Sequence, residues 1–161
     1  MAVLSRVWPL RVFHAGSPMF DVTVTRHIAA APEKVAAIMF DPGRDAEWLG
    51  GVKSVTMLTV APYDVGTRIR REGVLLGRKI VWMTETTVYD PGEWTEMCVI
   101  EGPFSGDIEY RIEPEGDGAR VFLINRGSRP GLPDFLSAIM VWMRAKADLK
   151  RLALLVEGTL E

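Results

Sequence analysis

The sequence contains few of the residues that build disulfides and metal centres. Its 161 residues include one cysteine, Cys98, and two histidines. A single cysteine cannot form an intramolecular disulfide, and this set lacks the ligands of a structural zinc site. The glycines are scattered at turns and form no phosphate-binding loop ahead of a helix. We therefore expect no metal, no cofactor, and a reducing compartment.

An excess of positive charge and a long apolar run are also missing. The 19 Lys and Arg residues are balanced by 21 Asp and Glu residues, so no broad positive field is present to attract a nucleic acid. No stretch approaches the roughly 18 apolar residues of a membrane span. Pro9, Arg11 and His14 interrupt the apolar residues near the N-terminus, unlike a signal peptide. We expect a cytoplasmic protein that binds no nucleic acid and spans no membrane.

The composition is that of a single globular domain. Hydrophobic residues make up 48% of the chain, with six Phe and five Trp, enough to build one core at this length. Regular patterns begin only at Met19, so we interpret residues 1–18 as an irregular N-terminal arm and residues 19–161 as the domain. The arm is either a segment that packs on a neighbour, as in a homodimer, or an over-extended start of translation.

The order of local patterns predicts an α+β fold. Apolar and polar residues alternate from Phe20 to Ile28, which is typical of a half-buried strand. Two short helical patterns follow and end at Gly50-Gly51. Six runs rich in Val, Ile, Thr, Trp and Tyr lie between Val52 and Asn125, and their short connections favour antiparallel pairing. From Asp134 to about Gly158 the spacing predicts one long amphipathic helix.

This order, together with the segment VTRHIAAAPEKVAAIMFDPGRDAEW, resembles a known superfamily over roughly residues 19–158. Its pieces mark helix starts, turns and sheet edges: Ala31-Pro32-Glu33 with Val35, Asp41-Pro42, Trp48, Val65-Gly66-Thr67, Tyr89-Asp90-Pro91, and Tyr110 before Gly118. The chain is similar to the START-related (SRPBCC) superfamily, which includes polyketide cyclase/dehydrase-like proteins, birch-pollen-allergen-like proteins and lipid-transfer domains. These pieces specify a fold and carry little information on chemistry.

The resemblance implies a helix-grip fold. In this fold a seven-stranded curved antiparallel sheet, two short helices and one long C-terminal helix surround an apolar cavity, whose entrance lies near the loops that flank the long helix. Members of the superfamily bind or transfer lipids, sterols, quinones, aromatic polyketides and plant hormones, and some cyclise or dehydrate polyketides. The implied partner is a hydrophobic small molecule.

Strand periodicity gives a first list of cavity residues. In the strand before Gly118, Ile108 and Tyr110 share one face, which we assign to the cavity, and acidic residues share the other. We favour Trp82 inward on its strand, whereas residues 93–101 leave both faces open. The candidate ligand contacts are Trp48, Arg70, Trp82, Cys98, Ile100, Ile108, Tyr110, Phe135, Ile139, Trp142 and Met143.

Two charged residues are weak catalytic candidates beside Tyr110. If Glu96 points inward, desolvation raises its pKa and suits it to acid–base work; otherwise it lies in water or pairs with Arg70. Arg70 is our choice for an inward cation that meets a polar group on the ligand, although arginines on such strands more often shield a sheet edge. No Ser/His/Asp or Cys/His set is evident.

Three functions remain open. The first is binding, transport or sequestration of a hydrophobic small molecule such as a lipid, quinone or aromatic polyketide. The second is a polyketide cyclase or dehydratase that uses Glu96, Arg70 and Tyr110, which requires these groups to converge in one cavity. The third is a protein interaction module with a vestigial pocket.

Overall fold

A computed structural model of the protein describes residues 20–158. Seven strands and three α-helices, with one short 3-10 helix, form in the expected order. The elements are β1 (Phe20–Ile28), α1 (Pro32–Met39), η1 (Pro42–Arg44), α2 (Asp45–Trp48), β2 (Val52–Met57), β3 (Arg68–Leu75), β4 (Arg78–Asp90), β5 (Trp94–Glu101), β6 (Ser105–Glu115), β7 (Gly118–Ser128) and α3 (Asp134–Val156).

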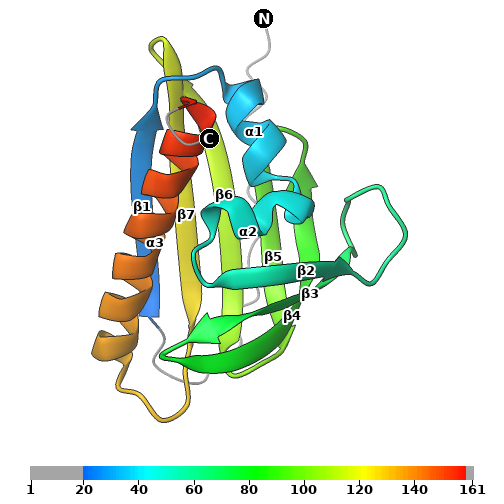
Figure 1. Cartoon of the computed structure of the whole chain (residues 1–161), viewed down its shortest axis with the longest axis vertical. Coiled ribbons are helices and arrows are strands. Elements are labelled where there is room, and N and C mark those ends of the chain that lie inside the picture. The colour runs from blue at the N-terminus through cyan, green and yellow to red at the C-terminus, as the bar shows by residue number, and fades with distance from the viewer. Residues whose placement is uncertain (1–19, 159–161) are drawn as a thin grey trace, which may run out of the picture.

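The strands form one antiparallel sheet in the order β1-β7-β6-β5-β4-β3-β2. Strands β2 to β7 follow one another as a meander, and β1 joins the far edge by pairing with β7. Helices α1 and α2 connect the two edges and lie in front of the sheet (Figure 1). This is the predicted α+β helix-grip architecture.

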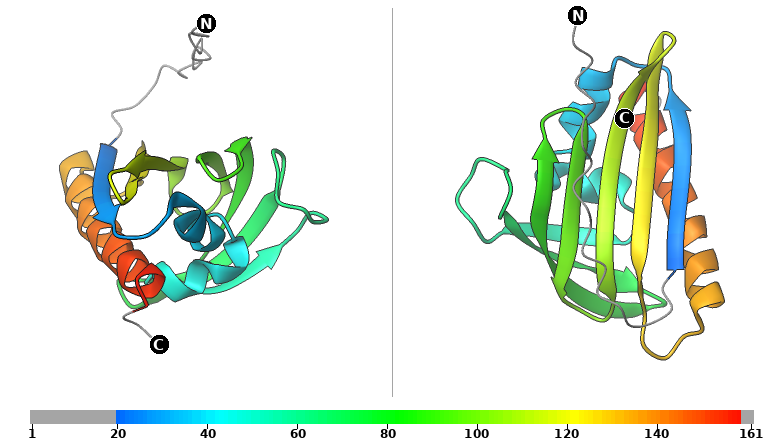
Figure 2. Two further views of the ribbon diagram at one scale, coloured as in Figure 1. Left: turned by 90° about the horizontal axis from the view of Figure 1, so that it is seen from above. Right: turned by 180° about the vertical axis from the view of Figure 1, so that it is seen from behind.

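The sheet is strongly bent, and the bend creates an inner face. Register shifts interrupt the pairing of β2 with β3 and of β4 with β5, and such bulges increase the local twist of a sheet. Seen from above, the strands curve around α1 while α3 covers the open side (Figure 2). Side chains on the concave face therefore point toward the space between the sheet and α3.

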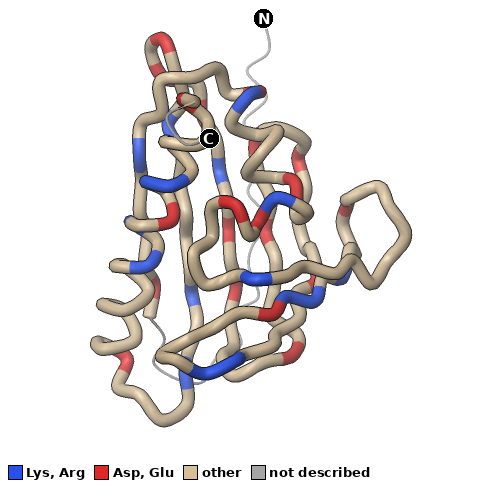
Figure 3. The backbone as a smooth tube through the Cα atoms, viewed as in Figure 1, with Lys and Arg blue, Asp and Glu red and all other residues tan. Residues whose placement is uncertain are grey.

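A two-residue turn brings the tip of the β3–β4 hairpin close to α3. Leu76 and Gly77 both have positive φ, 51° and 74°, the pattern of the tight hairpin turn whose twist matches that of the strands. Residues of this hairpin and of α3 border the same cavity. Basic and acidic residues both occur along the hairpin and along α3 (Figure 3).

The solid part of the core lies at the C-terminal end of α3. Leu149, Leu152 and Val156 are buried there against a cluster that includes Ile28 and Val35. Pro32 occupies the first turn of α1, as its fixed φ favours. This packing fixes one end of α3 against the sheet.

Two expectations fall outside this description. The irregular arm at residues 1–18, and a homodimer that would bury it, concern residues that lie outside the described range 20–158. Within that range, no helix is both long and apolar enough to cross a bilayer.

Candidate functional site

A cavity of about 530 Å³ lies between the concave face of the sheet and α3. Its volume is in the range typical of small-molecule sites. Apolar side chains from all seven strands, from the segment after α2, from the β5–β6 loop and from α3 make up most of its wall; they include Phe20, Leu49, Val52, Val74, Trp82, Val99, Phe104, Ile108, Leu123, Met140 and Val141. Such a wall favours a ligand that is mainly hydrophobic.

The rim of the cavity exposes apolar side chains to solvent. Leu76 at the hairpin tip is 70% exposed and Met143 on α3 is 61% exposed, and both border the cavity. Val74 on β3 is also exposed at this rim. The rim therefore offers a ligand apolar contacts before it enters.

Arg71 is the most deeply buried of the four arginines that line the cavity, the others being Arg126, Arg129 and Arg144. Its Nε donates to Asp45 Oδ2 at 2.7 Å, and its Nη1 donates to Thr84 Oγ1 at 2.8 Å. Both members of the ion pair are buried, and the pair joins α2 to β3. Because Asp45 compensates its charge, Arg71 presents a largely neutralised polar surface to the cavity.

Tyr110 on β6 places a phenol in the cavity wall. Its ring packs edge-to-face on Trp48, with centroids 5.5 Å apart. Burial, and next the charge of Asp45, raise the pKa of Tyr110 well above its ordinary value. The hydroxyl is therefore a proton donor throughout the physiological range.

Asp148 on α3 supplies a carboxylate at the same cavity. The residue is 4% exposed, and its Oδ1 accepts a hydrogen bond of 2.9 Å from the backbone N–H of Gly50. Burial raises the pKa of Asp148 to about 6, and the Gly50 hydrogen bond and the charges of Arg144 and Arg151 oppose the shift. The group changes charge near neutral pH.

Ser137 adds a second unusual polar group on the same side of α3. It lines the cavity and is buried, yet its hydroxyl has no hydrogen-bond partner within the described residues. A buried hydroxyl without a partner is costly. A polar ligand atom or a water molecule would offset that cost.

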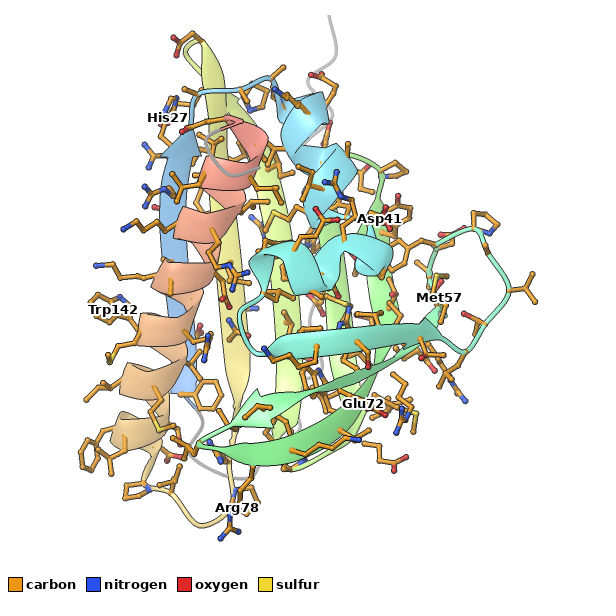
Figure 4. All side chains as sticks on the ribbon, viewed as in Figure 1. His27, Asp41, Met57, Glu72, Arg78 and Trp142 are labelled. Atoms are coloured by element: carbon orange, nitrogen blue, oxygen red, sulfur yellow. The ribbon has the colours of Figure 1, made fainter. Side chains whose placement is uncertain are left out.

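The prediction that Arg70 points into the cavity was wrong. Arg70 points to the outer face of β3 and pairs with Glu72, which projects from the hairpin in Figure 4; it does not line the cavity. Arg71, one residue later, is the inward arginine, because alternation places Ile69 and Arg71 on the inner face. The carboxylate that allows Arg71 to be buried comes from α2.

The sequence left open which face of β5 points into the cavity, and the structure places Glu96 on the outer face. Thr95 and Met97 are buried and Val99 lines the cavity, so the opposite set faces outward. Glu96 lies near Thr87 on the outer side, and neither Cys98 nor Ile100 reaches the cavity. Burial, and next the charge of Asp107, raise the pKa of the Cys98 thiol, which makes it a poor nucleophile.

Helix α3 exposes three residues expected at the cavity. Phe135, Ile139 and Trp142 are exposed, and Trp142 projects away from the sheet in Figure 4, with Lys146 Nζ 4.4 Å from its ring centroid. The C-terminal half fixes which stripe faces the sheet, and counting back at 100° per residue brings Val141 and Ser137 inward instead. Met143, at the rim, is the expected α3 residue that lines the cavity.

On the sheet, three expected residues do border the cavity. Trp82, Ile108 and Tyr110 are part of its wall, and their role as ligand contacts remains a prediction. Trp48 is fully buried beneath Tyr110 and supports the wall without forming it. Across residues 20–158, no group of three His, Cys, Asp or Glu side chains is placed to hold a metal ion.

The polar wall residues Asp148 and Ser137 were missed by the sequence interpretation, and Arg71 was one of a cluster of basic residues from which Arg70 was chosen instead. Asp148 and Ser137 each carried one available signal, since they lie on the same helical stripe as the apolar residues that pack on the sheet. A polar residue on a buried stripe indicates either a partner or a cavity. Arg71 carried no such signal, because nothing in the sequence favoured it over the neighbouring Arg70 as the arginine that points into the cavity.

Comparisons with known proteins agree with this architecture. Among solved structures, TTHA0849 of Thermus thermophilus is 26% identical, with a TM-score of 0.72 over 88% of this chain and 99% of that one. The Zhui aromatase/cyclase of a Streptomyces species is 16% identical, with a TM-score of 0.74 over 89% of this chain and 97% of that one. A START superfamily protein of Mycobacterium smegmatis is 22% identical, with a TM-score of 0.67 over 87% of this chain and 96% of that one.

Because the aromatase/cyclase and the START superfamily protein have low sequence identity to this chain, their similarity is evidence for the fold alone. A search of curated proteins gave no significant match. The family model described as polyketide cyclase / dehydrase and lipid transport matches residues 19–157. Because that match spans nearly the whole described domain, the chain belongs to the polyketide cyclase / dehydrase and lipid transport family.

Proposed function

We propose that the protein binds a hydrophobic small molecule, such as a lipid, a quinone or an aromatic polyketide, for transport or sequestration in the cytoplasm. The observation that carries the proposal is the cavity of about 530 Å³ with a mainly apolar wall. Transfer of apolar ligand surface from water into such a cavity is favourable by roughly 25 cal/mol per Å². A few polar groups in the wall then orient the ligand.

The charged groups of the wall can orient a ligand: Arg71, Arg126, Arg129 and Arg144 line the cavity together with Asp107 and Asp148. Arg71 is neutralised by Asp45, and Tyr110 remains protonated because burial raises its pKa. A ligand with a hydrophobic body and one polar or anionic end fits this distribution.

The proposal is tested by native mass spectrometry of the purified protein and by fluorescence titration with a fluorescent fatty acid and with 1,4-naphthoquinone. A copurified hydrophobic molecule, or saturable one-to-one binding of either probe, is the expected result. Failure of both probes, together with an empty purified protein, contradicts the proposal.

A matched pair of variants locates the binding. Val141 lines the cavity, so Val141→Trp fills part of it and should weaken probe binding at least about tenfold. Ile139 is exposed on the opposite side of the same helix, and Ile139→Trp should leave affinity unchanged. Equal effects of the two variants would place the bound probe outside the cavity.

A cyclase or dehydratase is the second candidate. The catalytic candidates from the sequence, Glu96, Arg70 and Tyr110, do not meet in one cavity, because Glu96 and Arg70 lie outside it. Asp148 instead supplies a wall carboxylate whose pKa is about 6, a value suited to acid–base work. Loss of one water from a β-hydroxyketone probe, detected by mass spectrometry and abolished in Asp148→Asn, would support this candidate over simple binding.

The interaction-module hypothesis rests on the exposed apolar residues of α3. Phe135, Ile139 and Trp142 together form an apolar outer surface of the kind that often contacts a partner. Sedimentation of the full chain tests whether a homodimer forms. A monomer that binds hydrophobic probes is the result expected under the leading proposal.

A further inference from the structure

Two arginines of α3 meet the backbone of the segment between α2 and β2. Arg144 and Arg151 lie two helical turns apart and so share one face of α3. A methyl group added to Gly50 would lie 2.6 Å from Arg144 Nη1 and 3.2 Å from Arg151 Nη1. The two guanidinium groups therefore approach the same point, and they are no farther apart than the sum of those distances. The absence of a side chain at Gly50 permits this approach.

Positive charge is in excess at this point. Asp148 lies between the two arginines on the same helical face, and its Oδ1 accepts from the backbone N–H of Gly50 at 2.9 Å. Across residues 20–158, no carboxylate oxygen lies within 4.0 Å of either guanidinium group. Two cations thus converge beside a single carboxylate that contacts neither of them.

The point lies at the border of the cavity. Arg144 lines the cavity together with Leu49 and Gly51 of the segment after α2, whereas Arg151 does not. Both arginines are exposed to solvent. Figure 1 shows α2 and the chain that follows it facing α3 in front of the sheet. A ligand can therefore reach the two arginines from solvent or from the cavity.

A purely structural role explains one of the two arginines. Arg151 Nη2 donates to the backbone carbonyl of Glu47 at 3.2 Å, and basic side chains stabilise the last carbonyls of a helix in this way. Arg144 makes no hydrogen bond with any residue from 20 to 158. Because like charges that converge repel each other, an anion between the two groups would relieve a cost that the cap leaves in place.

We infer that Arg144 and Arg151 form a phosphate-binding subsite at the border of the cavity. A guanidinium group donates parallel N–H bonds to phosphate oxygens. A phosphate monoester carries three acceptor oxygens and can accept from both arginines at once, whereas a carboxylate has only two oxygens to share between them. The ligand class is therefore a phosphate group, and the subsite makes and breaks no covalent bond.

This phosphate has two possible sources with the same chemistry at the arginines. It is either a free phosphate that binds from solvent, or the head of an amphiphile whose apolar body enters the cavity past Arg144. The second source rests on the proposed binding function. The first does not, so the two can be tested separately.

The test uses inorganic phosphate, decyl phosphate and decanoate at pH 8, with sodium chloride at equal ionic strength as the control for screening. Inorganic phosphate should raise the midpoint of thermal unfolding above the chloride control, because a ligand that binds the folded state stabilises it. In isothermal titration, decyl phosphate should bind at least about tenfold more tightly than decanoate.

Three variants locate the phosphate. Arg144→Gln and Arg151→Gln should each weaken phosphate binding about tenfold, through loss of a charged donor. Lys150→Gln removes the same charge from an exposed position on the same helix and should leave phosphate binding unchanged. Equal losses in all three variants would show that the phosphate responds only to the general charge of α3, and would overturn the subsite.

The two adjacent glycines offer a matched pair that leaves every charge in place. In Gly50→Ala the new methyl group meets Arg144 Nη1 and displaces it, so phosphate binding should weaken. In Gly51→Ala the nearest atom is the Val74 carbonyl oxygen at 3.8 Å, an ordinary contact, and phosphate binding should persist. Neither glycine has a positive φ. Thermal melting verifies that each variant is folded before titration.

The source of the phosphate follows from the variant Val141→Trp, which fills part of the cavity. If decyl phosphate binds more tightly than inorganic phosphate and this variant removes the gain, the phosphate is the head of an amphiphile. If the two probes bind equally and the variant has no effect, the ligand is a free phosphate. Both results support the subsite.

The inference and the proposed function fail in different ways. If chloride stabilises the protein as much as phosphate does, or if decanoate binds as tightly as decyl phosphate, the phosphate subsite is wrong, and binding of the fatty acid or the quinone still supports the proposed function. If inorganic phosphate binds through Arg144 and Arg151 but no hydrophobic probe binds, the proposed function fails and the subsite stands.

Discussion

The two halves of α3 are both rich in apolar residues, yet they do different work. In the C-terminal half, Leu149, Leu152 and Val156 are almost completely buried against the sheet and α1. In the N-terminal half, Val141 and Ser137 face the cavity, while Ile139 and Trp142 face solvent. One end of the helix provides stability and the other forms the wall of a space.

This difference shows that apolar content alone does not identify the packed core. A buried leucine gains transfer free energy and close contacts, whereas an apolar wall residue has empty space on one side and loses the contacts a neighbour would supply. The cavity end is less stable than it would be if filled. That loss leaves binding energy available to a ligand.

The largest effect should come from Arg71, which joins α2 to β3 at the border between the packed and hollow ends. Arg71→Met leaves the buried Asp45 carboxylate without its cation, and loss of one partner of a buried pair costs about 3–5 kcal/mol. Urea unfolding measures the change in free energy of unfolding. The double variant Arg71→Met/Asp45→Asn should recover part of the loss.

Arg70 provides the matched control for that substitution. It lies next to Arg71 but pairs with Glu72 on the outer face of β3, and exposed pairs contribute little. Arg70→Met should leave the unfolding midpoint nearly unchanged. A similar loss in both variants would contradict the assigned role of the buried pair.

A smaller effect should separate the two halves of α3 directly. Leu152→Ala creates a void in the packed half, where the residue is fully buried, and should destabilise the protein by about 2–4 kcal/mol. Val141→Ala enlarges a space that already exists and should cost less than about 1 kcal/mol. Urea unfolding of both variants measures this contrast, and equal losses would show that the cavity end is packed as tightly as the other.

The last expected effect depends on pH and concerns Asp148. Its pKa is about 6 in the folded protein and 3.8 in its ordinary state, so the folded state binds the proton more tightly. The stability associated with this group is complete below pH 4 and is lost as the pH rises through 6. At 1.36 kcal/mol per pKa unit, the loss is at most about 3 kcal/mol.

Asp148→Asn should therefore be more stable than the wild type at pH 8, and the difference should shrink toward pH 4. Urea unfolding at both pH values measures the difference. Asp117→Asn, at an exposed turn, should show no such trend. A constant difference across this range would mean that Asp148 titrates normally.

The fold was predictable because its signals are local and repeated. Strict alternation identified the inward face of β6, with Ile108 and Tyr110 on the cavity side, and turn residues marked the strand ends. The same method failed to choose a face for β5, because Trp94, Cys98 and Ile100 on one face are as apolar as Met97 and Val99 on the other. The alternation of side chains along the strand then does not indicate which face points inward.

The polar site was harder to predict because its contacts join distant segments. Arg71 can be buried only because Asp45 reaches it from α2. Asp148 accepts a hydrogen bond from Gly50, which lies 98 residues earlier in the sequence. Neither pairing leaves a periodic signal in the sequence. On α3, more apolar residues are present than the inner stripe can accommodate, so hydrophobicity could not exclude Phe135 or Trp142.

The pairing of the first strand with the last has a consequence for the order of assembly. Phe20 on β1 lies opposite Gly127 on β7, so an edge that closes the sheet depends on a partner about one hundred residues downstream. During synthesis at 5–20 residues per second, β1 waits roughly 5–20 s for that partner. The meander from β2 to β7 can form through neighbouring hairpins, whereas β1 must close a loop that contains nearly the entire domain. Completion of the sheet is thus a late event, and it is the same event that brings β1 beside α3.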